Sequence, residues 1–147
     1  MVFLCLLSTY LTQQATAEEA KKADSKVYFT LGNQHEFPLT DEREVFGCSD
    51  KIFTVVELDH LPKATYQLSI AWIDPSDTER ERSEYPFSVT LDQTRLWSWL
   101  SLSRATGAGL IQWIDPAAGL EEFIGEWTVE VRINNKKIST KNFEVVC

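Results

Sequence analysis

Hydrophobic residues along this chain occur in short runs that are rich in β-branched and aromatic side chains and are separated by turn-forming residues. From residue 126 to residue 133 every second side chain, beginning with Trp127, is hydrophobic, and the side chains between them are polar. This alternation is typical of a strand with one buried face. The same reading along the chain predicts strands at residues 27–31, 52–58, 66–73, 85–91, 94–102, 109–114, 126–133 and 137–146.

The last two predicted strands form a hairpin. Asn134 and Asn135 lie between them and supply the two positive-φ positions of a type I′ turn. Ile138 is in phase with the hydrophobic side of the preceding strand, whereas Phe143 has the opposite parity. We therefore expect a β-bulge within residues 139–142, or else a final strand that turns onto another sheet.

One segment predicts a helical turn. In PAAGLEEFIGEW, Leu120, Phe123 and Ile124 have i, i+3, i+4 spacing. No long amphipathic pattern occurs elsewhere, so this segment is interpreted as a single turn linking two strands. Seven or eight short strands with frequent turns predict an all-β sandwich.

The closing stretch FIGEWTVEVRINNKKISTKNFEV resembles the last hairpin of bacterial immunoglobulin-like and macroglobulin-like modules. In those modules a Gly-x-aromatic-x-Val-x-Val strand meets a short polar turn and a final strand ending in Phe-x-Val. The matching positions are Gly125, Trp127, Val129, Val131 and Phe143. The resemblance implies an immunoglobulin-like antiparallel β-sandwich of about 7–8 strands. It is a signature of a fold and not of an activity.

The first residues indicate export. A short apolar run is followed by Ala-Thr-Ala at 15–17, which fits a signal-peptide cleavage site. We therefore expect a signal peptide at 1–17, a flexible leader at 18–26, and a β-sandwich domain at 27–147 in the periplasm or outside the cell. The alternative is a buried N-terminal strand. No other segment has the length needed to span a bilayer, so no membrane insertion is expected after cleavage.

Removal of that peptide leaves two of the three cysteines, Cys48 and Cys147. An even pair in an exported chain predicts one disulfide. It would close a loop of about 100 residues, which the chain-entropy model values at about 4.7 kcal/mol. Free thiols or an intermolecular bridge are the alternatives. The spacing is too wide for the inter-sheet bridge of antibody domains.

Charge and motifs restrict the function. The formal net charge is −8, which argues against a nucleic-acid partner and against anionic membrane surfaces. The only histidines, His35 and His60, are interpreted as solvated turn residues, and no nucleophile motif is present. Zinc, EF-hand and phosphate-loop motifs are also missing from the sequence. We therefore expect that the protein is not an enzyme and that it binds no metal and no cofactor.

The sequence WIDP occurs twice, at 72–75 and at 113–116. In each copy Trp-Ile ends a predicted strand, Asp is placed to bond to nearby backbone, and Pro blocks further pairing. The flanking residues do not align, so we interpret WIDP as a device for ending a strand and not as an internal repeat.

The remaining unusual feature is aromatic density. In RLWSWLSL a strand places Trp97 and Trp99 on one face and Leu96, Leu100 and Leu102 on the other. The tryptophans either fill the core, form a protein interface, or provide a platform for sugar rings.

The sequence therefore predicts an exported, non-enzymatic binding or adapter domain that makes protein–protein contacts. The alternative is a carbohydrate-binding module that uses the same tryptophans. The expected contact face consists of these tryptophans and the adjacent loop, residues 74–84. A weak calcium site in this loop is less favoured than a solvated loop with salt bridges, because arginines alternate with its acidic residues. The predicted contact residues are Trp97, Trp99, Asp74, Asp77, Glu79, Arg80 and Arg82.

Overall fold

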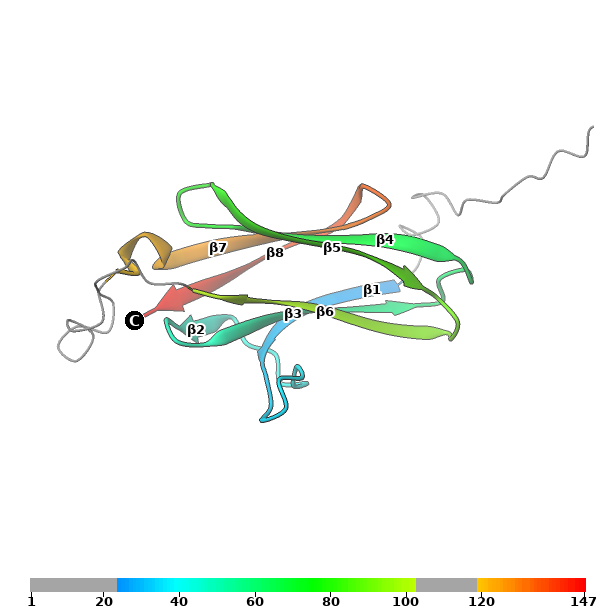
Figure 1. Cartoon of the computed structure of the whole chain (residues 1–147), viewed down its shortest axis with the longest axis horizontal. Helices are drawn as coiled ribbons and strands as arrows, with labels where there is room; N and C mark the ends of the chain where they lie inside the picture. The colour runs from blue at the N-terminus through cyan, green and yellow to red at the C-terminus, as the bar shows by residue number, and fades with distance from the viewer. Residues whose placement is uncertain (1–23, 103–118) are drawn as a thin grey trace, which may run out of the picture.

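A computed structural model describes residues 24–102 and 119–147 as two β-sheets packed face to face (Figure 1). The three-stranded sheet has the order β1-β3-β6 and the five-stranded sheet has the order β2-β8-β7-β4-β5. The strands are β1 (Asp24–Leu31), β2 (Val45–Gly47), β3 (Lys51–Asp59), β4 (Thr65–Ile73), β5 (Glu79–Ser88), β6 (Gln93–Ser101), β7 (Gly125–Ile133) and β8 (Lys136–Val146). A 3-10 turn, η2 (Glu121–Phe123), precedes β7.

The strand order is that of an immunoglobulin-like sandwich. In such domains strands A, B and E share one sheet, and C, F and G share the other. Here β1, β3 and β6 take the places of A, B and E, while β4, β7 and β8 take those of C, F and G. Neighbouring strands are antiparallel, except that the short β2 runs parallel to the end of β8. The predicted all-β fold is confirmed.

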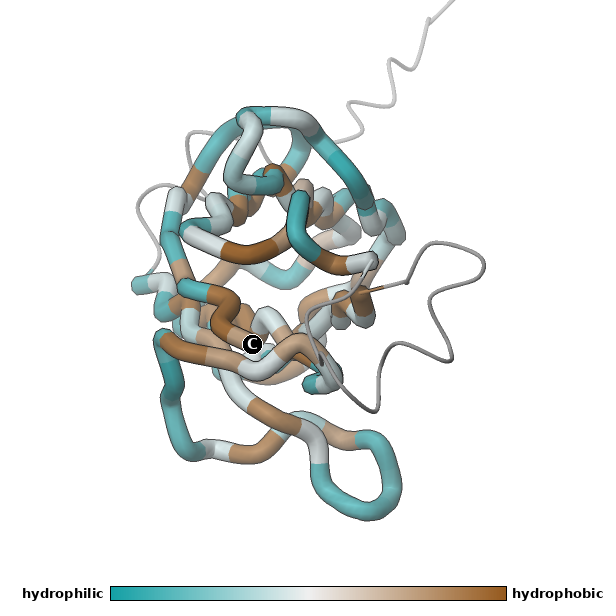
Figure 2. The backbone as a smooth tube through the Cα atoms, turned by 90° about the vertical axis from the view of Figure 1, so that its left-hand side faces the viewer, coloured by the Kyte–Doolittle hydropathy of each residue, from teal (hydrophilic) through white to brown (hydrophobic). Residues whose placement is uncertain are grey.

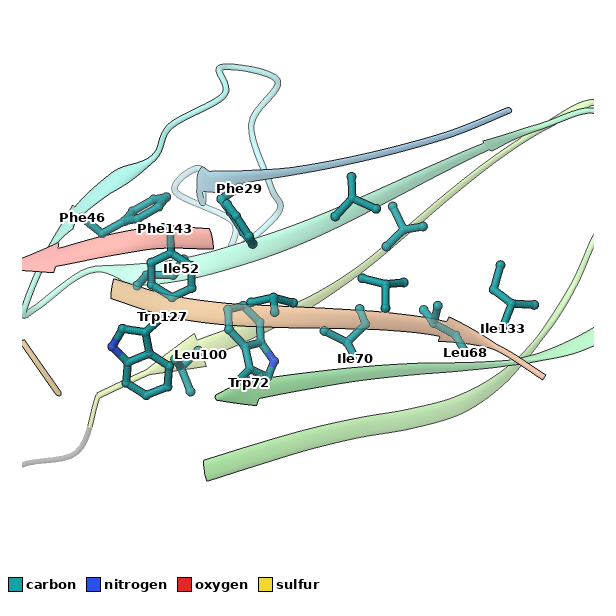
Figure 3. Packing of buried hydrophobic residues seen from close by; sticks show 14 of the residues in the cluster. Phe29, Phe46, Ile52, Leu68, Ile70, Trp72, Leu100, Trp127, Ile133 and Phe143 are labelled. Carbon is teal, nitrogen blue, oxygen red and sulfur yellow. The ribbon is translucent and has the colours of Figure 1, made fainter. Parts of the chain in front are cut away.

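The buried side chains explain why these segments pair. On β4 alternate residues such as Leu68, Ile70 and Trp72 are fully buried and point between the sheets. Figure 3 shows that aromatic rings gather at one end of this core, around Phe143 and Trp127, and that aliphatic side chains continue to the other end. Seen end-on, hydrophobic segments lie in both layers and the outlying loops are largely hydrophilic (Figure 2).

The prediction misplaced the start of β5 and missed the short strand β2. β5 begins at Glu79 and not at residue 85, and β2 was not predicted at all. Residues 79–84 read ERERSE, which shows no apolar alternation because this part of β5 is an exposed edge strand. β2 is only three residues long and is held by pairing with β8. The predicted strand at 109–114 and the predicted signal peptide at 1–17 lie outside the described residues, and β1 begins within the predicted leader.

The last hairpin has the predicted turn but a different bulge. Asn134 and Asn135 have φ values of 48° and 65°, as a type I′ turn requires. The register passes from Val131 opposite Ser139 to Arg132 opposite Lys137. Ile138 is therefore the extra residue, one position before the predicted range of 139–142. The parity change was correctly inferred, but its position was not.

The C-terminus is held next to β2. Cys48 and Cys147 lie at disulfide distance, with their Cα atoms 5.3 Å apart at a sequence separation of 99. Cys48 is buried, and the parallel β2–β8 pairing ends immediately beside it. The cross-link and the pairing therefore hold the same end of the sandwich. Within the described ranges no helix is long and apolar enough to cross a membrane.

Candidate functional site

The outer face of the three-stranded sheet carries a second hydrophobic cluster, separate from the main core. Phe53 and Val55 on β3 point away from the other sheet and are fully buried. Tyr28 on β1 and Trp97 on β6 lie opposite Val55 in the strand register and pack beside it. We call Tyr28, Phe53, Val55 and Trp97 the outer aromatic cluster.

The loop at residues 32–44 makes this burial possible by folding over the outer face. Figure 1 shows it leaving the three-stranded sheet on the side away from the other layer. Its start is fixed by a β-bridge between Gly32 and Pro38. Phe37, itself 54% exposed, packs edge-on against Trp97 with ring centroids 6.0 Å apart. A side chain at Gly32 has no room, because a Cβ there would lie 2.7 Å from the Phe53 ring.

Arg95 ties the loop to the strands. Its Nη2 donates to the carbonyl of Leu39 and to the Tyr28 hydroxyl, both at 3.0 Å. The Tyr28 hydroxyl in turn donates to Glu57 at 3.0 Å. These bonds join β6, β1, β3 and the loop, so the surface above the outer aromatic cluster is held in one arrangement.

Trp99 lies at the border of this surface and is 50% exposed. The Lys51 ammonium lies 4.0 Å from the centroid of its ring and forms an ion pair with Glu36 at 3.1 Å. A cation above an exposed indole contributes about 0.5–1 kcal/mol. The Trp99 ring is thus oriented by a neighbour while half of its surface stays open to solvent.

A groove opens beside Trp99, between β6 and the facing edge of β5. We call it the edge groove; its volume is about 300 Å³. Its lining consists of Glu81, Ser83, Ser98, Trp99, Leu100 and Ser101. A smaller hollow of about 190 Å³ continues from it towards Phe123 and Trp127 and shares Glu81, Leu100 and Ser101 with it.

The edge groove is closed at one end by contacts between the two strands. The hydroxyls of Ser83 and Ser98 are hydrogen-bonded at 2.5 Å, and the Tyr85 hydroxyl donates to the carbonyl of Trp97 at 3.0 Å. Burial raises the pKa of Tyr85, against a smaller lowering by the bond to Trp97. Beyond this closure, towards Ser101, the two strand edges separate and the groove begins.

The side chain of Asp74 is buried and stabilises the turn after β4; it is not part of the surface. Its side chain has no exposed area, and its Oδ1 accepts bonds from the backbone N–H groups of Ser76 and Thr78 and from the Ser76 hydroxyl. Arg80 Nε donates to its Oδ2 at 2.5 Å. Burial raises the pKa of Asp74, but the bonds from Ser76, Thr78 and Arg80 together lower it to about 2. The first WIDP therefore ends β4 as predicted, and the second lies outside the described residues.

The other predicted loop residues point in different directions. Arg80, which binds Asp74, also donates from its Nη2 to Glu122 at 3.0 Å and lies over the Phe123 ring. It therefore connects the start of β5 to the turn before β7. Arg82 donates to Glu79 at 2.8 and 2.5 Å. This bond from Arg82 lowers the pKa of Glu79.

The predicted contact residues therefore do not form one surface. Arg82 lies opposite Ala71, whose side chain points away from the core, so the Glu79–Arg82 pair is on the outer face of the five-stranded sheet. Trp97 and Trp99 belong to the opposite layer. Asp77 lies in the exposed turn after β4, with a φ of 64°.

Phe37 and Lys51 also border the site but were not predicted from the sequence. Glu81 belongs to the predicted contact loop, residues 74–84, although it was not among the named contact residues. Phe37 lies in a segment of turn-forming residues. A hydrophobic side chain in such a segment indicates that the loop packs onto the body of the protein. Lys51 is the first residue of β3 and is brought beside Trp99 only by the β3–β6 register. Glu81 occupies an inward-facing position on β5, opposite the buried Trp72, which only the pairing reveals.

Catalytic and metal-binding groups are sparse in the described ranges. His35 and His60 are exposed in turns, as expected. Within residues 24–102 and 119–147, no three His, Cys, Asp or Glu side chains gather in a metal-binding arrangement.

No family model and no curated protein matches the chain. Among solved structures, an alkylpurine DNA glycosylase from Pseudomonas fluorescens, bound to DNA containing an abasic-site analogue, aligns at a TM-score of 0.50 and 13% identity. The match covers 85% of this chain and 31% of the glycosylase, so the chain spans about a third of that protein. An immunoglobulin-like protein from Pseudomonas aeruginosa aligns at a TM-score of 0.49 and 11% identity, covering 84% of this chain and 94% of that one. At such identities the likeness concerns the fold alone.

Proposed function

We propose that the chain is an exported, non-enzymatic binding domain that contacts a protein partner through the surface around Trp99. The observation that carries the proposal is the state of that indole: half exposed, oriented by Lys51, and bordered by a groove. Tryptophan is enriched among the residues that dominate binding energy at protein interfaces, especially where a rigid surround holds it. The outer aromatic cluster supplies that rigidity.

The opposite face of the sandwich is less suited to the same task. The outer face of the five-stranded sheet carries paired charges, such as Glu130 with Arg132 at 3.0 Å and with Lys137 at 3.2 Å. Such pairs are solvated and cost free energy to bury. A partner that excludes water therefore gains more at Trp99.

The proposal is tested by site-specific cross-linking in the cells that produce the protein. A photo-reactive amino acid at Ser101, which is exposed beside Trp99, should capture a discrete protein partner. The same probe at Lys137, on the opposite face, serves as the matched control and should not capture it. Trp99→Ala should abolish the product at position 101. An unchanged product in Trp99→Ala, or the same partner from position 137, would contradict the proposal.

A carbohydrate-binding module is the second candidate, and the edge groove favours it. Its hydroxyls at Ser83, Ser98 and Ser101 and the carboxylate of Glu81 border an exposed indole, which is a suitable set for a sugar ring. Titration with soluble polysaccharides should then change tryptophan fluorescence, and Trp99→Ala should remove the change. Trp97→Phe, which keeps Trp99, should leave it in place.

The location that we propose is the periplasm or the exterior of the cell. The pairing of Cys48 with Cys147 supports it, because structural disulfides persist in oxidising compartments. Fractionation of the producing cells, with thiol labelling of the denatured, unreduced protein, tests this. We expect the wild-type protein in the periplasmic or external fraction, with no labelled thiol. Recovery in the cytosol with Cys48 and Cys147 both labelled would refute the proposed location.

A further inference from the structure

We propose that the edge groove receives an extended peptide segment of the partner, paired with β6, and that a Lys or Arg side chain of this segment binds Glu81. The inference rests on the proposed protein-binding function and names the chemistry of the partner. Three features of the groove carry it: the backbone edge of β6, the missing edge protection, and the carboxylate.

The backbone of β6 has pairing groups directed into this region. The carbonyl of Trp97 accepts a bond from Tyr85 on β5, so it points away from β3. Alternate residues of a strand direct their backbone groups to the same side, so those of Trp99 and Ser101 do as well. Among the described residues no backbone bond reaches these groups from that side. Trp99 and Ser101 therefore present two N–H donors and two carbonyl acceptors to an added strand.

β6 also lacks the devices that keep other edges from pairing. The free edge of β8 carries Lys136, Lys137 and Lys141, and β5 carries alternating charges and Pro86. Lysines, charges and proline are the usual means of blocking edge-to-edge association. From Leu96 to Ser101, β6 has only apolar residues and serines. An edge of this kind is a template for strand addition.

Glu81 determines the charge of the expected ligand. It lines both the edge groove and the smaller hollow. Its backbone pairs with β4, but within the described residues its carboxylate has no side-chain hydrogen bond or ion pair. The neighbouring Arg80 is already engaged by Asp74 and Glu122, and Arg82 by Glu79. A basic side chain entering the groove would meet a carboxylate that no Lys or Arg of the described ranges pairs with. The net charge of −8 favours the approach of such a segment.

The larger cleft of the molecule is a weaker candidate for the same ligand. It has a volume of about 700 Å³, and the charged residues of its lining are Glu42, Arg43, Glu44 and Lys141. Glu42 is already paired with Lys26, and lysine and arginine side chains share the lining. Two basic side chains offset the two acidic ones in this cleft, whereas among the described residues that line the edge groove Glu81 alone is charged.

The test uses acetylated, amidated peptides of about seven residues, the length of an ordinary strand, with alternating threonine and valine. One has a central lysine, and matched peptides have glutamine or glutamate in its place. Binding to the full chain is measured by titration, and amide hydrogen exchange locates it. The lysine peptide should bind most tightly and should slow exchange of the Trp99 and Ser101 amides.

Variants separate the backbone contribution from the charge contribution. Glu81→Gln should weaken binding of the lysine peptide about tenfold and leave that of the glutamine peptide unchanged. Ser101→Pro removes one edge N–H without breaking the β3–β6 ladder, so it should weaken binding of every peptide. Ser101→Ala keeps the N–H and is the matched control. Denaturant midpoints for all variants verify that they fold.

Each contrary result has a defined meaning. Equal affinity for lysine and glutamine peptides, or no effect of Glu81→Gln, overturns the assignment of a basic side chain. If no peptide protects Trp99 and Ser101 while the cross-link from position 101 still depends on Trp99, strand addition is wrong and the proposed function stands. If that cross-link is absent as well, the proposed function fails. If an oligosaccharide and none of the peptides slows exchange of the Trp99 amide, the ligand of the edge groove is a sugar and not a peptide.

Discussion

Lys51 and Trp99 face each other across the β3–β6 pair, with the Lys51 ammonium 4.0 Å from the centroid of the indole. They lie on the same outer face, because Phe53 is directly opposite Trp99 and Lys51 is two residues before Phe53. Two residues far apart in the sequence thus form one diagonal cross-strand contact. That contact fixes the orientation of the half-exposed indole of Trp99.

Replacement of Lys51 by methionine keeps the apolar stem and removes the charge. We expect it to lower the free energy of unfolding by about 0.5–1 kcal/mol, the contribution of an exposed cation–π contact, and to shift the fluorescence of Trp99. Urea unfolding and emission spectra check this. Lys63→Met, at an exposed lysine outside the sheets, is the matched control and should change neither. An unaltered spectrum in Lys51→Met would show that the ring is not held by the ammonium.

Gly32 is expected to tolerate no side chain. In Gly32→Ala the new Cβ would lie 2.7 Å from the Phe53 ring, which is packed in the outer aromatic cluster. Overpacking of this kind costs about 1–3 kcal/mol. Urea unfolding should therefore show a lower midpoint, and hydrogen exchange should show a loosened loop at residues 32–44.

Gly47→Ala provides the control for that experiment. Its Cβ would meet Asp50 Oδ2 at 3.5 Å, which is an ordinary contact. We expect a stability change near zero or a slight gain, because alanine reduces the freedom of the unfolded chain. A loss in Gly47→Ala as large as that in Gly32→Ala would mean that the outer aromatic cluster is not the cause.

Much of the fold could be predicted from the sequence, because alternating hydrophobic and polar residues indicate a strand and show which of its faces is buried. β7 is an example: its even spacing from Trp127 to Ile133 gives both the strand and its inward side. β5 shows the limit of this reasoning. Its first half lies at an edge and is charged on both sides, so no period of two separates an inner face from an outer one. Only pairing with β4 makes it a strand.

The site was less predictable than the fold because it depends on register and on a covering loop. The sequence correctly singles out Trp97 and Trp99 as a pair on one face. It gives no indication that Trp97 is covered by Phe37 while Trp99 is not. Proximity along the chain also suggested that residues 74–84 join the tryptophans, but β5 and β6 lie in different layers, so of this stretch only Glu81 and Ser83 line the edge groove with Trp99. Glu79 and Arg82 consequently face away from Trp99.

Asp74 should make stability depend on pH in the acid range. Its pKa of about 2 in the folded state is below the ordinary value of 3.8, so folding favours the ionised form. The stabilisation is fully present above the unfolded-state pKa and is lost as pH falls through about 2. Asp74→Asn should lower the free energy of unfolding by about 1–2 kcal/mol at neutral pH, and the difference should shrink towards pH 2. Denaturant curves from neutral pH to pH 2 measure it. A difference between the proteins that is constant with pH would contradict the role of ionisation.

The link between Cys48 and Cys147 should contribute more to stability than any single contact on the surface. It closes a loop of 99 residues, and an intact disulfide over such a loop contributes about 2–5 kcal/mol. The double variant Cys48→Ser and Cys147→Ser should unfold at correspondingly lower denaturant than the oxidised protein. It should match the wild type measured with reductant, because both lack the cross-link. Hydrogen exchange should quicken first at the parallel pairing of β2 with the end of β8, which the link holds in register. If reductant left the wild-type midpoint unchanged, the two thiols would be close but not bonded, and the parallel pairing alone would hold the C-terminus.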